Sequence, residues 1–532
     1  MNPLSSVTGK QWEKIAVKHH HGINLPLSAL HSAQSCGIGE FFDLIPIIDW
    51  CKQVGFDVIQ LLPLNTTDND PSPYNPNSSC ALSFIYLSLY ALPLMEKIPD
   101  LKEKLTEFHK FNLSPKVPHA DVLAHKLLWL RSYFDAVGTE ITNNPVFLQF
   151  CGENLWVQSY ALFKILKNQL GNTPCATWPQ ELQFLSKEKR KELLLKHHLE
   201  ILFYSLLQFL CYEQLKKVKA HAEECHVLLM GDIPILISKE SVDVWQYPEY
   251  FDLNFAAGAP PDIFNPEGQY WGFPLFFLDT LRKNQFDWWI KRLRFAEDFF
   301  DIFRIDHALG FFRIWAIPLN HPVQEGYFIP VNEAQASIQG QEMLKTLISN
   351  TTMLPIAENL GVVASFICPC LEELGICGTK VMRWERKWEQ DGSFIPFEEY
   401  TPISLTTVST HDSETLTLWW QECPEEAKLF AATKNWSYSL LLSQKQRLEI
   451  LWDSHHTPSL FHVNLLQEYL SLFPDLSWDN PLEDRINIPG KVLSTNWTFR
   501  FRPSVEALIS HQKLSSILQN LAFSTAPPTE VL

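Results

Sequence analysis

Short apolar runs alternate along the chain with longer segments whose apolar residues recur at helical spacing. Residues 21–27 and 57–63 are two such runs. Between them, residues 41–54 place apolar side chains three and four positions apart, and Gly55 supplies a stop. A run, a helical segment and a second run predict a β-α-β unit, the building block of a parallel sheet.

The same alternation continues to the end of the chain. Eight strands with helical segments between them favour a closed (β/α)8 barrel, the TIM-barrel fold, over an open sheet. We expect one barrel over residues 1–532, interrupted by insertions at about 86–195 (mostly helical), 245–285 (loops that cover a cleft) and 310–350. The six further predicted strands are residues 226–232, 301–307, 353–358, 378–382, 405–410 and 459–465.

Composition narrows the classes of function. The formal net charge of −17 argues against nucleic acid as a partner, because such a partner requires a basic face. The longest apolar run, residues 201–211, is too short to cross a bilayer, and no secretory segment is recognised at the start, so we expect a cytoplasmic protein. Eleven cysteines without a pattern fit a reducing compartment. Cys368, Cys370 and Cys377 have no nearby histidine, so we expect small buried residues and no metal site.

Residues 301–307 combine a buried strand with polar chemistry. Arg304 and Asp306 are two positions apart and therefore share one face of the strand. The positive charge of Arg304 is expected to keep the Asp306 carboxylate ionised. This stretch alone fits a structural ion pair as well as it fits an active site.

Three predicted strands end in an acid: Asp306, Glu358 and Asp412. Ends of parallel barrel strands converge on one mouth, so these acids can meet. Glycoside chemistry needs one ionised and one protonated carboxyl group, and the apolar run before Glu358 suits the proton donor. Singly, Glu358 or Asp412 could equally be a helix cap; together they favour a catalytic site, with His411 gripping sugar hydroxyls.

Sequence motifs over nearly the whole chain then resemble one family, the 4-α-glucanotransferases (amylomaltases or disproportionating enzymes) of glycoside hydrolase family 77. The motifs include the sequences at 22–28, 72–74, 150–156, 231–234, 258–262, 268–274, 303–307, 357–361, 409–412, 485–490 and 495–497.

This resemblance implies a retaining transferase that moves a segment of an α-1,4-glucan donor to a glucose or maltooligosaccharide acceptor. It implies that Asp306 is the nucleophile, Glu358 the acid/base and Asp412 the stabiliser of the transition state. It also implies no cofactor, no metal and no β-sandwich domain after the barrel. The residues expected to bind substrate are Tyr74, Asp232, Gln269, Trp271, Arg304, His307, His411 and Asn496.

Two other functions stay open. A hydrolase of the amylase or debranching type would use the same three carboxylates, and a non-catalytic barrel could bind glucan without cutting it. A phosphate-handling barrel is disfavoured because no glycine-rich phosphate loop follows the late strands. The chain also departs from the family pattern at Asn359, where an Asp is usual, and at Ser413-Glu414, where Asn-Asp is usual.

Overall fold

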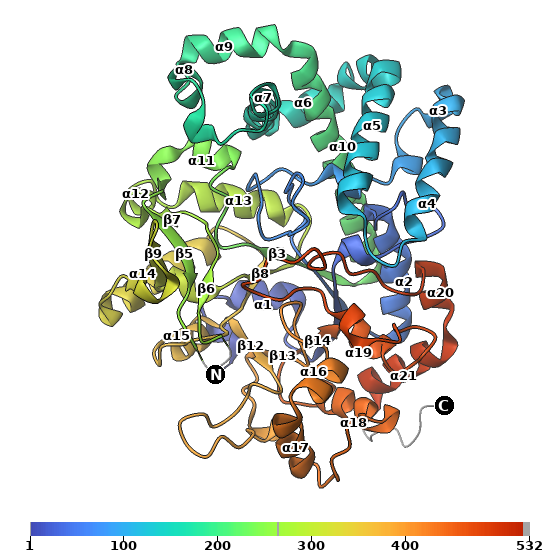
Figure 1. Cartoon of the computed structure of the whole chain (residues 1–532), viewed down its shortest axis with the longest axis vertical. Coiled ribbons are helices and arrows are strands. Elements are labelled where there is room, and N and C mark those ends of the chain that lie inside the picture. Colours follow the sequence, from blue (N-terminus) through green and yellow to red (C-terminus); the bar gives the residue numbers. More distant parts are fainter. Residues whose placement is uncertain (1, 263–264, 525–532) are drawn as a thin grey trace.

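The computed structural model describes residues 2–262 and 265–524. Eight parallel strands close into a barrel at its centre (Figure 1). Each of the eight predicted runs contributes one strand, so the barrel prediction is confirmed. Around the barrel the strand order is β1 (His20–Leu25), β14 (Phe461–Leu465), β13 (Ser404–Thr407), β12 (Cys377–Val381), β11 (Leu354–Ala357), β8 (Ile302–Ile305), β3 (Leu228–Ile233) and β2 (Val58–Leu61).

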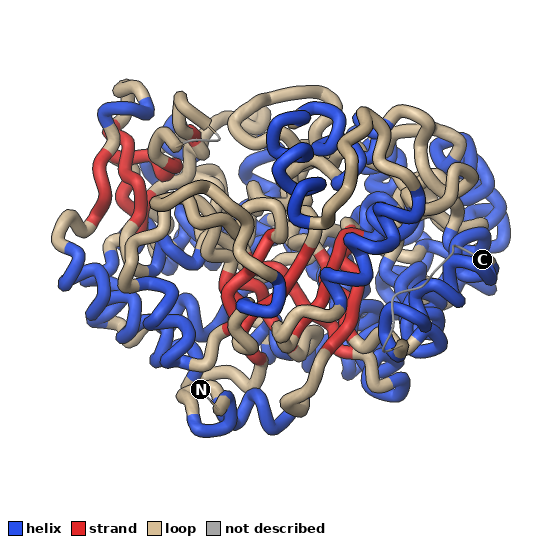
Figure 2. The backbone as a smooth tube through the Cα atoms, turned by 90° about the horizontal axis from the view of Figure 1, so that it is seen from below, coloured by secondary structure: helices blue, strands red, loops and turns tan. Residues whose placement is uncertain are grey.

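Helices surround this barrel, as the view in Figure 2 shows. The predicted first helix is α2, and Gly55 ends it in the left-handed conformation with φ +83°. A residue with a Cβ adopts that conformation less readily, which explains the glycine. The helices that precede the later barrel strands are α10 (His198–Cys225), α13 (Asp287–Glu297), α14 (Glu333–Ile348), α15 (Ile367–Leu374) and α18 (Gln444–His455), while α2 spans Leu44–Val54.

One connection departs from the predicted alternation. Between β12 and β13 the described chain forms only a short 3-10 helix, Phe397–Glu399. Residues 383–396 lack an apolar stripe at helical spacing and contain Gly392 with φ +68° and Pro396. The expectation of a helical segment at every connection is therefore wrong here, because a helix at this place would have no apolar face to bury.

The connection from β2 to β3 is long and helical. It contains seven α-helices before α10 and lies at the top and upper right of Figure 1. A buried ion pair of 2.5 Å between Lys126 and Glu40 ties this region to the start of α2. The helices are α3 (Pro99–Glu103), α4 (His109–Asn112), α5 (His119–Thr142), α6 (Pro145–Glu153), α7 (Trp156–Gln169), α8 (Gln180–Gln183) and α9 (Lys187–Lys196).

Residues 245–285 and 310–350 join in one structure although the sequence separates them. Strands from both ranges form a four-stranded antiparallel sheet in the order β10 (Tyr327–Ile329), β9 (Ile314–Pro318), β5 (Phe255–Ala259) and β6 (Gln269–Tyr270). This sheet stands apart from the barrel strands in Figure 2. Residues 263 and 264 of the first range lie outside the described part. Neighbouring elements are β4 (Phe251–Asp252), β7 (Leu275–Phe276), α11 (Val242–Gln246) and α12 (Leu278–Lys283).

The remaining α-helices lie before β1, between β13 and β14, and after β14. In the described residues, no helix combines the length and the apolar character needed to cross a bilayer. These helices are α1 (Gly9–Ile15), α16 (Leu416–Glu422), α17 (Pro424–Thr433), α19 (Leu466–Leu470), α20 (Val505–Ser510) and α21 (Gln512–Phe523).

Candidate active site

Arg304 is the centre of a charged cluster at the carboxyl ends of three adjacent strands. One of its guanidinium nitrogens lies 2.7 Å and 3.0 Å from the two carboxylate oxygens of Asp232, and 3.3 Å from Oδ1 of Asp306. Its other terminal nitrogen lies 4.0 Å from Glu358. Because β3, β8 and β11 are neighbours in the barrel, three acids that are far apart in sequence meet at one guanidinium.

Asp306 experiences two opposing effects on its pKa, one from burial and one from Arg304. Burial raises the pKa of this carboxyl group to about 7, and the charges of Asp232, Glu358 and Asp412 raise it as well. Arg304 lowers that pKa, as the sequence predicts, but does not offset burial in the ligand-free protein. Arg304 therefore acts on Asp306 in the predicted direction, but burial opposes it, and a sequence does not show how deeply a strand end is buried.

Glu358 is fixed by backbone groups on both sides. Its Oε2 accepts a hydrogen bond of 2.7 Å from the His307 N–H, and its Oε1 accepts one of 2.9 Å from the Leu360 N–H. His307 itself adopts the left-handed region at φ +42°, a backbone conformation that is uncommon for a residue with a Cβ and is found at functional sites. The next helix, α15, begins only at Ile367, so Glu358 is not its cap.

Asp412 is held from two directions. Nδ2 of Asn487 donates a hydrogen bond of 2.6 Å to its Oδ1, and Nε2 of His411 lies 3.3 Å from its Oδ2. Burial raises the pKa of Asp412, but His411, Asn487 and Arg304 outweigh it and bring that pKa down to about 2. Helix α16 has Thr415 as its N-cap residue, so the helix-cap alternative is wrong for Asp412.

Aromatic rings lie on two sides of the acids. The rings of Tyr74 and His411 stack with centroids 4.9 Å apart, and the Tyr74 hydroxyl donates a hydrogen bond of 2.6 Å to Asp232. Trp271 approaches His307 edge to face at 4.8 Å, and its indole N–H donates to Gln269 at 3.0 Å. Tyr74, Gln269, Trp271, His307 and His411 therefore lie around the same mouth.

Two residues that are expected to bind substrate, Asp232 and Asn496, make hydrogen bonds to protein groups instead. Both carboxylate oxygens of Asp232 accept bonds from Arg304, and one also accepts from Tyr74. The amide of Asn496 bonds to backbone groups of Ile488 and Lys491. In this structure Asp232 and Asn496 orient the parts of the site, and a direct contact with sugar stays a prediction for each.

The sequence does not predict the roles of Asn487, which bonds to Asp412, and of Glu414. Glu414 accepts from Arg383 at 2.8 Å and from Arg485 at 2.7 Å, so it fastens the loop that carries Asn487. Asn487 and Arg485 both stand in a motif of the resemblance, which was the only signal available for them. The Glu at the unusual Ser413-Glu414 pair thus has a structural reason.

Asn359, the other departure, also has a partner. Its Oδ1 accepts a hydrogen bond of 2.8 Å from the backbone N–H of Thr379 on β12. An aspartate oxygen would accept the same bond, so the amide keeps the link from the Glu358 loop to the next strand.

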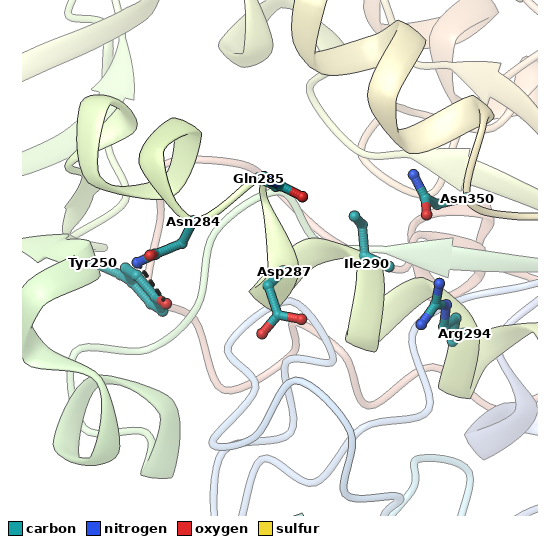
Figure 3. Close-up of a pocket in the computed structure, with 7 residues that line it drawn as sticks. All are labelled: Tyr250, Asn284, Gln285, Asp287, Ile290, Arg294 and Asn350. Carbon is teal, nitrogen blue, oxygen red and sulfur yellow. Dashed lines mark hydrogen bonds between the residues drawn. The ribbon is translucent and has the colours of Figure 1, made fainter.

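A second, open pocket of about 540 Å³ lies away from the acids, beside α12 and α13 (Figure 3). Within it, Asn284 donates a hydrogen bond of 3.2 Å to the Tyr250 hydroxyl. None of the predicted site residues lines this pocket, so the candidate active site is the cluster at the barrel mouth. Its lining residues are Tyr250, Asn284, Gln285, Asp287, Ile290, Arg294 and Asn350.

Known proteins match the chain over almost its full length. A 4-alpha-glucanotransferase from Chlamydia pneumoniae is 43% identical over 518 residues, covering 97% of this chain and 98% of its own. One from Synechocystis is 30% identical, covering 88% of this chain and 91% of its own. Among solved structures, an amylomaltase from Streptococcus agalactiae in complex with acarbose has a TM-score of 0.79 at 23% identity, covering 95% of this chain and 98% of its own. This last likeness concerns the fold.

The family model matches in the same way. The model of glycoside hydrolase family 77, described as 4-alpha-glucanotransferase, matches residues 25–506. That range contains seven of the eight barrel strands in full and the last residue of β1, and it contains every acid of the cluster. The chain therefore belongs to the 4-alpha-glucanotransferase family, glycoside hydrolase family 77.

Proposed function

We propose that this protein transfers a segment of an α-1,4-glucan to the 4-hydroxyl group of an acceptor glucose or maltooligosaccharide, with retention at the anomeric carbon. The observation that carries the proposal is the meeting of Asp306 and Glu358 at one guanidinium, with Asp412 at the same mouth. Double displacement requires two carboxyl groups that flank one glycosidic bond.

Asp306 is the nucleophile and Glu358 the acid/base of this proposal. The Asp306 carboxylate forms a bond to the anomeric carbon while the bond to the leaving glucan oxygen breaks and Glu358 gives that oxygen its proton. In the second step Glu358 takes the proton of the acceptor 4-hydroxyl, whose oxygen replaces Asp306. Arg304 stays within reach of both carboxyl groups and orients them.

Asp412 is the stabiliser of positive charge on the sugar. With its pKa held to about 2, Asp412 is ionised at neutral pH, so it can face an oxocarbenium-like transition state. Tyr74, stacked on His411, offers a flat face beneath the sugar.

Transfer rather than hydrolysis is supported by the loop that carries Gln269 and Trp271. The ring of Trp271 lies against His307, next to the acid pair, where it reduces access of water to the intermediate. A hydrolase with the same carboxylates is the competing function, and its products differ.

Incubation with maltotriose separates these functions. Transfer yields glucose plus a ladder of longer maltooligosaccharides, whereas hydrolysis yields maltose and glucose only. The substitution Asp306→Asn should abolish either activity while the unfolding temperature stays near that of the parent; near-normal transfer by Asp306→Asn would refute the catalytic assignment. As a matched control, Asp279→Asn changes an exposed acid of α12 that pairs only with Arg282 among the described contacts, and should leave transfer unchanged.

A further inference from the structure

A cluster of three different metal-donor groups lies on the outside of the barrel, where the proposed transfer reaction does not use it. It consists of Asp49 on α2 and of His221 and Cys225 on α10. His221 and Cys225 are four positions apart and so share one face of their helix. Helices α2 and α10 pack against each other, which brings Asp49 to that face.

The distances between the donor atoms are close to those of a tetrahedral zinc site. Cys225 Sγ lies 3.5 Å from Asp49 Oδ1 and 3.7 Å from His221 Nε2, and these last two atoms are 2.8 Å apart. Zinc bonds of about 2.0–2.3 Å at tetrahedral angles place such donors about 3.3–3.6 Å from one another. Only the pair of Asp49 and His221 must open, by roughly half an ångström.

The surroundings allow that adjustment. The side chain of Asp49 is 57% exposed and that of His221 is 28% exposed, so Asp49 can change its rotamer and a water can take a fourth position. Cys225 is buried. An ordinary surface pair of His and Asp explains two of these groups, but it does not explain a cysteine sulfur within 3.7 Å of both.

We propose that Asp49, His221 and Cys225 bind one divalent cation of the zinc class, which joins α2 to α10. On binding, the thiol proton passes to the solvent, and bonds from sulfur, imidazole nitrogen and carboxylate oxygen replace three of the metal's water ligands. In the described part of the chain this is the one group of three such residues whose donor atoms all lie within 4.8 Å of one another.

The place of the cluster predicts what the ion does. Cys225 ends α10, three residues before β3 begins at Leu228, whereas the acids lie at the opposite, carboxyl end of the strands. The ion therefore stabilises the folded barrel without entering the transfer reaction. Of the three cysteines that the sequence predicts to be buried, Cys370 and Cys377 are buried, whereas Cys368 is exposed and that part of the prediction is wrong.

The test uses the full chain, reduced and freed of metal with a chelator. Zinc added in competition with a chromogenic chelator should bind at one equivalent. At zinc concentrations about 100-fold above the dissociation constant, the unfolding temperature should rise by about 2 °C. Cobalt(II) should show a thiolate charge-transfer band, which reports the sulfur directly.

Variants decide whether these three residues are the ligands. Cys225→Ser and His221→Gln should each weaken zinc binding at least about tenfold and remove the thermal shift, and Cys225→Ser should remove the cobalt band. Cys151→Ser, a thiol on α6 outside the cluster, is the matched control and should change none of these. The proposal is overturned if the parent binds no equivalent of zinc tightly. It is also overturned if Cys225→Ser and His221→Gln bind zinc as tightly as the parent.

Discussion

Replacing Asn487 tests whether the acid at the end of β13 works only when the protein orients it. In Asn487→Ala, Asp412 loses the hydrogen bond of 2.6 Å that fixes its Oδ1, and His411 is left as the neighbour on one side only. In Asn487→Asp the shape is kept, but a second negative charge faces Asp412 at the same distance. The two variants thus separate loss of orientation from electrostatic repulsion.

The structure sets the size of the effect. A hydrogen bond to a charged group contributes about 1.5–3 kcal/mol. The side chain of Asp412 is 44% exposed, so solvent screens part of this, and about 1–1.5 kcal/mol remains. Loss of that amount from the transition state lowers kcat/KM by about 5- to 15-fold in Asn487→Ala. Asn487→Asp should lose more, because a like charge also raises the pKa of Asp412.

The assay is the initial rate of glucose release from maltotriose, fitted for kcat and KM. The loss should fall on kcat, since Asp412 acts on the charge of the transition state. Asn480→Ala is the matched control. Asn480 lies in the same loop, caps a short helix there and makes no hydrogen bond to Asp412 among the described contacts, so the activity of this variant should stay near that of the parent. Wild-type kcat in Asn487→Asp would refute the reasoning.

Two further predictions concern the active site, and a third concerns a buried histidine on β1. Asp232→Asn should lower kcat by about 10-fold or more with little change in KM, because Asp232 orients Arg304; a raised KM with unchanged kcat would mean that Asp232 contacts sugar instead. Trp271→Ala should increase free glucose relative to longer maltooligosaccharides, and an unchanged product ratio would contradict a role in excluding water. Burial lowers the pKa of His21 from 6.5 to about 4 despite Asp57, so the unfolded chain takes up a proton first as pH falls. The stability gained by burying the neutral His21 is therefore fully present above pH 6.5. As pH falls from 6.5 to 4, the free energy of unfolding decreases by about 3 kcal/mol. Urea unfolding at several pH values should therefore show a flatter dependence in His21→Gln, and an unaltered slope would count against this assignment.

The barrel is predictable from the sequence because its signal is local. A run such as residues 353–357 is apolar throughout since a barrel strand is buried on both faces, and the helix before it shows its buried stripe at a spacing of three and four. The connection from β12 to β13 was predicted wrongly because the helix expected there came from the barrel pattern and not from the residues themselves. Residues 383–396 contain no apolar stripe at helical spacing.

The candidate acids are also predictable, because Asp306, Glu358 and Asp412 follow strands whose ends share one mouth. Their electrostatics are not. The protonation of Asp306 depends on its depth and on Asp232, Glu358 and Asp412 together, which no single segment contains. Likewise, the sequence does not show that Asp232 accepts hydrogen bonds from Arg304 and Tyr74.

The sequence by itself thus determined the eight strands, most of their helices, the three acids and the family, since each depends on neighbouring residues or on recognisable motifs. Only the tertiary structure decided the contacts between distant segments. It joined residues 255–259 to 314–318 in one sheet, placed Asn487 on Asp412, and brought Asp49 to His221 and Cys225. Such contacts are set by how helices and loops pack, and packing is a property of the whole chain rather than of any stretch of it.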